Sequence, residues 1–178
     1  MAEPAQNLEQ PEGHLSEKEG KYLTFTLGQE EYGIGILKIK EIIGMMPITR
    51  VPHTPEYVKG VINLRGKVIP VVDLRQKFGM TEIDYSERTC IIVVEIEGRS
   101  GEVMVGLVVD SVSEVLNIRG DEIEETPAFG ASEDTDYILG MAKMDGMVKI
   151  LLDIDQVLRA EEVALVRQTL YEKHEEDQ

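Results

Sequence analysis

The 178-residue chain contains no tryptophan, one cysteine and three histidines, and aromatic residues make up only 5% of it. A single cysteine, Cys90, excludes an internal disulfide and is typical of a reducing compartment. Cys90 lies in the apolar run TCIIVVEI, where we expect an inert thiol in a buried strand. No run is long enough to span a bilayer, and the N-terminus lacks a signal-peptide core. We therefore expect a cytoplasmic protein with no direct membrane insertion.

Basic side chains are also scarce: 18 Lys and Arg stand against 34 Asp and Glu, for a net charge of −16. Such a charge argues against nucleic acid and anionic lipid as partners. The balance is uneven, because residues 21–80 carry nine basic and five acidic side chains, or +4, and residues 81–158 carry five and eighteen, or −13. Solubility alone accounts for this asymmetry; two halves that face different partners would account for it as well.

Residues with the spacing of a catalytic, cofactor or metal site are lacking too. His14, His53 and His174 are isolated from one another, which excludes a pattern of zinc ligands. The run GVINLRGKV has neither the spacing nor the hydroxyl of a phosphate-binding loop, and no G-x-S-x-G elbow occurs. The carboxylates that cluster in residues 119–136 lie in a polar stretch that predicts a long, exposed and mobile loop. An enzyme that uses this acidic loop is therefore a disfavoured alternative, and we predict no catalysis, no cofactor and no metal.

What the chain does contain is a repeat. YVKGVINLRGKVIPVVDLRQKF, residues 57–78, recurs without a gap as YILGMAKMDGMVKILLDIDQVL, residues 137–158. A spacing of 73 residues aligns a second set of positions: Gly33/Gly106, Ile39/Val112, Glu41/Glu114, Ile42/Val115 and Ile43/Leu116. Such self-similarity indicates one structural unit used twice. The turn differs between the copies, since Asn63-Leu64-Arg65 becomes Lys143-Met144-Asp145.

Short alternating and apolar runs separated by turns predict strands throughout both copies. Two runs flank Arg65-Gly66 and predict a hairpin, while Pro70 in the second run indicates an edge strand or a bulge. The whole predicts an all-β fold of two small closed barrels, residues 21–80 and 81–158, with strands that can be exchanged between them. Helical spacing after Asp153 predicts a C-terminal amphipathic helix over residues 159–170. We expect an acidic, disordered tail over residues 1–20 and a second acidic tail over residues 171–178.

The segments EYGIGILKIKEII, YVKGVINLRGKVIPVVDLRQKFG and VGLVVDSVSEVL closely resemble the CheW family of chemotaxis coupling proteins. The resemblance covers about residues 21–170, and the NLRG turn followed by PVVDLR is specific to that family. It implies two five-stranded SH3-like barrels with a hydrophobic groove between them. It also implies a non-catalytic adaptor that links the cytoplasmic tips of chemoreceptors to the regulatory domain of the histidine kinase CheA. Receptors would thereby control autophosphorylation of the kinase. Such an adaptor would be recruited to receptor arrays at the inner face of the membrane.

The resemblance further implies a set of partner-binding positions, namely Ile39, Glu41, Gly60, Asn63, Arg65, Gly66, Val112 and Val115. Among these, Arg65 is replaced by Asp145 in an otherwise similar frame, so a partner contact explains it better than a fold requirement. Glu41 either pairs with Arg65 or, like Glu114, is merely structural; the sequence favours neither.

Gly60 and Gly66 recur in the second copy as Gly140 and Gly146, which indicates a role in the backbone. Ile39, Val112 and Val115 are either core residues or the lining of a groove for an apolar helix. The alternative function is a peptide-binding twin-barrel module of another chemosensory or signalling pathway.

Overall fold

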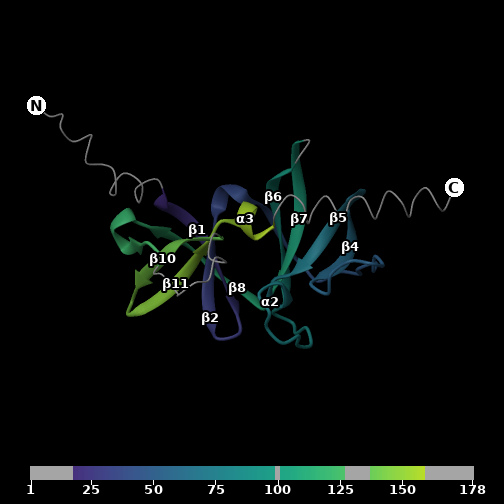
Figure 1. Ribbon diagram of the computed structural model, residues 1–178, viewed down its shortest axis with the longest axis horizontal. Helices are drawn as coiled ribbons and strands as arrows, with labels where there is room; N and C mark the ends of the chain where they lie inside the picture. Colours follow the sequence, from purple (N-terminus) through teal and green to yellow (C-terminus); the bar gives the residue numbers. More distant parts are fainter. Residues whose placement is uncertain (1–17, 99–100, 127–136, 159–178) are drawn as a thin grey trace, which may run out of the picture.

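The computed structural model describes residues 18–98, 101–126 and 137–158, which form eleven strands and four short helices (Figure 1). The elements are, in chain order, β1 Gly20–Leu27, β2 Glu30–Gly35, η1 Ile36–Lys38, β3 Ile39–Gly44, β4 Val58–Leu64, β5 Lys67–Asp73, α2 Leu74–Lys77, β6 Cys90–Gly98, β7 Gly101–Val109, β8 Ser111–Ile118, η2 Gly120–Glu122, β9 Ile123–Glu124, β10 Ile138–Met144, β11 Met147–Leu152 and α3 Ile154–Val157.

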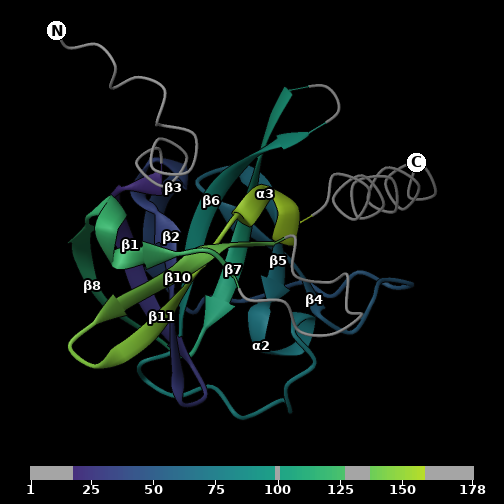
Figure 2. The ribbon, with the colours of Figure 1, turned by 60° about the vertical axis from the view of Figure 1, so that its left-hand side comes forward.

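The strands form two sheets, and the all-β prediction is confirmed. One sheet has the order β8-β1-β2-β11-β10-β9 and the other the order β3-β6-β7-β5-β4. Neither sheet is built from one half of the sequence. The early strands β1 and β2 lie in the sheet of β8 to β11, and β6 and β7 lie in the sheet of β3, β4 and β5. Figures 1 and 2 show the sheets as two lobes side by side, with α2 and α3 at the junction between them.

The two sheets share one register across five strands. In the five-stranded sheet, the residues paired across neighbouring strands are Glu41, Val93, Gly106, Val71 and Gly60. In the six-stranded sheet they are Glu114, Thr24, Gly33, Leu151 and Gly140. Both spacings of the sequence repeat, 73 and 80 residues, are thus present in one ladder, which shows that the repeat is a repeat of structure.

Each sheet curls, so that the segment following the edge strand at one side of the sheet meets the strand at the opposite side. After β3, Thr49 forms an isolated antiparallel bridge with Val61 of β4, through two N–H···O bonds of 2.8 Å. After β8, the two-residue strand β9 pairs with β10 in the same way. The family resemblance implied five strands in each unit. The strand β9 makes the second sheet six-stranded, because its contact with β10 extends over two residue pairs, whereas Thr49 forms only one with β4.

Three apolar clusters stabilise this arrangement. One lies within the five-stranded sheet and contains Ile62, Ile69 and Val93. A second lies within the six-stranded sheet, around Ile118 and Ala142. The third is shared between the sheets. Its buried members come from β1, β2, β4 to β7, β11, α2 and α3, with Leu158 after α3. Since burial of apolar surface is the main favourable term in folding, this shared cluster makes the two sheets one unit.

Three predictions are corrected by the structure. The ordered chain begins before Lys21, because Gly20 starts β1 and the Glu19 carboxylate accepts a 2.8 Å bond from the Gly120 N–H. Part of the acidic loop is structured, with η2 followed by the buried Ile123 of β9. Pro70 lies in β5, which has a neighbour on each side, although the ladder to β7 begins only at Val71.

Other predicted segments fall outside the described residues. These are residues 1–17, 127–136, the helix predicted over 159–170, and the tail 171–178. Within the described ranges, none of the helices has the length and apolar character required to cross a membrane.

Candidate partner-binding surface

The β4–β5 hairpin places Arg65 at an exposed tip. Arg65 has a φ of 52° and Gly66 a φ of 90°, and at the β10–β11 tip Asp145 and Gly146 have φ values of 54° and 76°. Two successive residues with positive φ are typical of the tight turns that match the twist of paired strands. The backbone of the two turns is therefore alike, and the side chain differs: a guanidinium in one and a carboxylate in the other.

Asn63 supports the first turn. Its side-chain oxygen accepts a 2.8 Å hydrogen bond from the Gly66 N–H. In the second turn the equivalent residue, Lys143, instead forms a 2.6 Å ion pair with Glu124. The sequence change from Asn to Lys thus replaces a bond internal to the turn by a bond to a neighbouring strand.

Glu41 of β3 forms an ion pair with Arg65, one of the two alternatives that the sequence left open. The Arg65 Nη2 group donates to Glu41 Oε2, while 70% of the arginine side chain stays exposed. An exposed pair contributes only about 0–1 kcal/mol to folding. Its main effect is to hold the guanidinium at Glu41 of the edge strand β3, while most of the arginine side chain stays accessible to solvent.

Gly60 is a buried residue of β4, in the same hairpin. Its φ is 139°, and a Cβ added there would lie 2.0 Å from the Thr49 carbonyl oxygen. Gly60 therefore permits the bridge that ties Thr49 to Val61 of β4, and it offers no side chain to a partner.

The three apolar candidates do not join the hairpin group. Ile39 at the start of β3 and Val112 near the start of β8 are half-buried and pack against the cluster shared by the two sheets. Val115 lies further along β8 and is 50% exposed. The structure thus separates the predicted residues into a polar hairpin group and an apolar group at and beyond the junction of the sheets.

Further exposed apolar residues accompany these candidates. Leu37 in η1, next to Ile39, is 95% exposed, and Ile42, the repeat equivalent of Val115, is 45% exposed. Val68 and its equivalent Val148, together with Met147, are exposed at the two hairpins. The repeat alignment identified the pairs, but an alternating pattern does not tell which face of an edge strand stays uncovered.

Cys90 at the start of β6 lies beside Val112. Burial raises the pKa of its half-buried thiol, and a backbone hydrogen bond from Val112 opposes part of this rise. A raised pKa keeps the thiol neutral and unreactive, since the thiolate is the nucleophile.

The described residues contain no group of three or more His, Cys, Asp or Glu side chains that could hold a metal ion. A surface hollow of about 740 Å³ lies between residues 48–59 and 82–85, lined by both charged and apolar side chains. None of the predicted site residues lines it, although Lys59, which precedes Gly60, does.

Comparison with known proteins agrees with this geometry. The CheW-like domain family matches residues 21–162. The chemotaxis protein CheW of Klebsiella aerogenes is 44% identical over 146 residues, covering 82% of this chain and 86% of its own, and that of Rhizobium meliloti is 35% identical over 149 residues, covering 84% and 94%.

The crystal structure of the scaffolding protein TtCheW from Thermoanaerobacter tengcongensis is similar as well. It superposes with a TM-score of 0.67 at 40% sequence identity, covering 75% of this chain and 88% of that one. The chain therefore belongs to the CheW family of non-catalytic chemotaxis scaffold proteins.

Proposed function

We propose that this scaffold couples chemoreceptors to the histidine kinase CheA in the cytoplasm, at receptor arrays on the inner face of the membrane. Coupling requires surfaces for two partners on one rigid body. The polar hairpin group around Arg65 and the apolar group around Ile39 and Val112 are two such surfaces, of different chemistry, on a fold with a shared core.

The observation that carries the proposal is that the two hairpin turns have the same backbone conformation but side chains of opposite charge. Arg65 and Asp145 have nearly the same φ, 52° and 54°, so the turn itself accepts either side chain. An arginine held by Glu41 with most of its surface exposed offers several donors to carbonyl or carboxylate acceptors on a partner. We assign this turn to partner contact on that ground.

The apolar group fits a different ligand. Ile39 and Val112 are half-buried, and the exposed Leu37 precedes Ile39 by two residues. Apolar side chains that are partly accessible in this way suit the apolar face of a helix. The cytoplasmic tip of a chemoreceptor is the helical partner that we propose for this surface.

A reconstitution tests the function. The full chain is mixed with receptor signalling fragments and CheA, and kinase autophosphorylation and co-sedimentation are measured with and without it. We expect the chain to bring the kinase into the receptor pellet and to make its autophosphorylation depend on the receptor. Failure of both would contradict the proposal. Binding of receptor fragments without any effect on the kinase would favour the alternative, a peptide-binding module of another pathway.

A further inference from the structure

The chain crosses between the two sheets at two places among the described residues, and each crossing carries an ion pair. The first crossing, from β7 to β8, contains Asp110, whose Oδ2 accepts a 2.7 Å bond from Arg75 Nη1 of α2. The second, from β2 to β3, is η1 and ends in Lys38, whose Nζ lies 2.5 Å from Asp155 Oδ2 of α3. Each pair thus joins a crossing to a helix.

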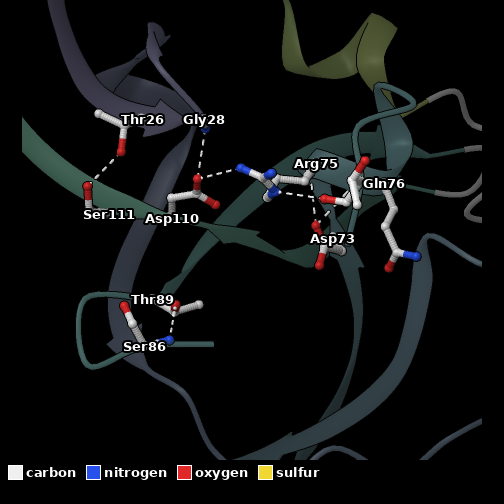
Figure 3. A network of polar contacts seen from close by, with 10 residues as sticks. Thr26, Gly28, Asp73, Arg75, Gln76, Ser86, Thr89, Asp110 and Ser111 are labelled. Atoms are coloured by element: carbon white, nitrogen blue, oxygen red, sulfur yellow. Dashed lines mark hydrogen bonds and ion pairs between the residues drawn. The ribbon is translucent and has the colours of Figure 1, made fainter. Parts of the chain in front are cut away.

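The carboxylate of each pair also binds a hairpin. Asp110 Oδ2 accepts a 2.8 Å bond from the Gly28 N–H in the β1–β2 turn, as Figure 3 shows. Asp155 Oδ1 accepts a 3.0 Å bond from the Glu97 N–H near the end of β6. We name the first clamp Asp110, Arg75 and the Gly28 N–H, and the second clamp Lys38, Asp155 and the Glu97 N–H.

Both clamps tie one sheet to the other. In the first clamp, α2 follows β5 of the five-stranded sheet and Gly28 belongs to the six-stranded sheet. In the second clamp, α3 follows β11 of the six-stranded sheet and Glu97 belongs to the five-stranded sheet. A carboxylate that accepts two donors, one of them charged, forms the stronger class of hydrogen bond. Each clamp therefore resists movement of the sheets relative to one another.

The clamps are related by the repeat but have opposite polarity. Arg75 and Asp155 are 80 residues apart, the spacing of the repeat, so the two helices carry opposite charges at one position. The crossings carry the complementary charges, Asp110 and Lys38. In both Figure 1 and Figure 2, α3 and α2 lie at opposite ends of the junction between the lobes. Because the clamps lie at opposite ends, a rotation of one sheet against the other in either sense would pull apart the ion pair of one clamp.

The crossing residue of each clamp lies next to an apolar candidate: Lys38 immediately precedes Ile39, and Asp110 precedes Val112 by two residues. We propose that the two clamps are positioning devices, which fix the angle between the sheets and so place Ile39 and Val112 for partner binding. The inference rests on the proposed function. The first clamp is the more shielded, with Arg75 and Asp110 13% and 21% exposed against 40% and 27% for Lys38 and Asp155.

A distance measurement tests the clamps without any partner. Spin labels are placed at the repeat-equivalent, exposed positions Lys67 and Met147, one on each hairpin, in a Cys90→Ala background, and the distance distribution is recorded by pulsed electron paramagnetic resonance. We expect a single narrow distribution that broadens in Arg75→Met/Lys38→Met. The control is Lys143→Met, which removes an exposed pair within one sheet and should leave the distribution unchanged.

Binding tests the positioning role in unlabelled proteins. We expect Arg75→Met/Lys38→Met to bind receptor fragments about three- to tenfold more weakly, because the competent angle becomes only partly populated. If this double variant does not fold, Lys38→Met alone is measured, since its pair is the more exposed. An unchanged distance distribution overturns the clamps, and a broadened one with unchanged affinity overturns their positioning role. Absence of binding by the unaltered chain would instead contradict the proposed function, while the distances still test the clamps.

Discussion

Glu41 and Glu114 occupy one position in two copies of the same ladder, yet only Glu41 holds an arginine. Glu41 is paired with Val93 across the strands, and Glu114 with Thr24, whose hydroxyl donates a 2.9 Å bond to the Glu114 carbonyl oxygen. The Glu114 side chain is exposed and has no ion pair among the described residues. Since the backbone environment is shared, the difference lies in the opposing hairpin, which carries Arg65 in one copy and Asp145 in the other.

The first prediction compares these two glutamates. Glu41→Gln should weaken partner binding about two- to fivefold, because Arg65 loses the charge that holds it, while the free energy of unfolding changes by about 0–1 kcal/mol. Glu114→Gln, the matched control, should alter neither. Titration of each variant with CheA and with receptor fragments measures the effect. Equal losses in both variants would show that the asymmetry of the turns has no role in binding.

The second prediction concerns two glycines of the hairpin. Gly60→Ala should lower the free energy of unfolding by about 3 kcal/mol, since its Cβ would meet the Thr49 carbonyl and its backbone conformation is unfavourable for alanine. Gly66→Ala meets open space at a φ of 90° and should cost only about 1–2 kcal/mol. Urea unfolding of both variants gives the comparison. A Gly60→Ala protein as stable as Gly66→Ala would contradict the supporting role of Gly60.

A third prediction uses Cys90 as a reporter. Because burial raises the pKa of its thiol, Cys90 should react with a disulfide reagent at pH 8 more slowly than the same thiol in urea. The folded pKa lies above the unfolded one, so the onset of reaction should move to higher pH in the folded protein. A partner bound over Val112 should slow the reaction further. Reaction of the folded chain as fast as in urea would contradict the assigned burial.

The fourth prediction concerns alkaline pH. The hydrogen bond to Asp155, and then the neighbouring carboxylates, raise the pKa of Lys38 despite opposition from partial burial. A raised folded pKa means that the stabilisation is fully present below the unfolded pKa, roughly 10.4, and is lost as pH rises through the folded value. The stability difference between the unaltered chain and Lys38→Met should therefore be constant from pH 7 to about 10 and shrink above it. A difference that grows above pH 10 would contradict the ion pair.

Much of the fold follows from the sequence because apolar periodicity and turn chemistry are local. The Arg65-Gly66 turn, its strands and the internal repeat are all predicted correctly. Which strands share a sheet is not determined locally. Although β1 and β2 come early in the sequence, they join the sheet of late strands because Gly33 of β2 pairs with Leu151 of β11. No local pattern specifies that parallel contact. The burial of Ile123 was not predicted for a similar reason, since a single apolar residue among acidic neighbours gives no periodic pattern.

The candidate site was predicted in part. The contrast between Arg65 and Asp145 is visible in the alignment of the repeats, and the ion pair to Glu41 was one of two open alternatives. The clamps were not predicted, because Arg75 and Asp155 appear in the alignment only as a mismatch of charge. Their partners, Asp110 and Lys38, lie on crossings whose position depends on the tertiary fold.

The most direct test of the account is the affinity of Arg65→Asp, which installs the residue of the second turn in the first. Its control is Lys67→Asp, which reverses an exposed charge in the same hairpin that has no ion pair among the described residues. Affinity for CheA and for receptor fragments is measured for both, with thermal unfolding alongside. We predict that Arg65→Asp keeps its melting temperature but binds one of the partners about tenfold more weakly, whereas Lys67→Asp changes much less. Unfolding of Arg65→Asp, or binding equal to that of the unaltered chain, would contradict the assignment of this turn to partner contact.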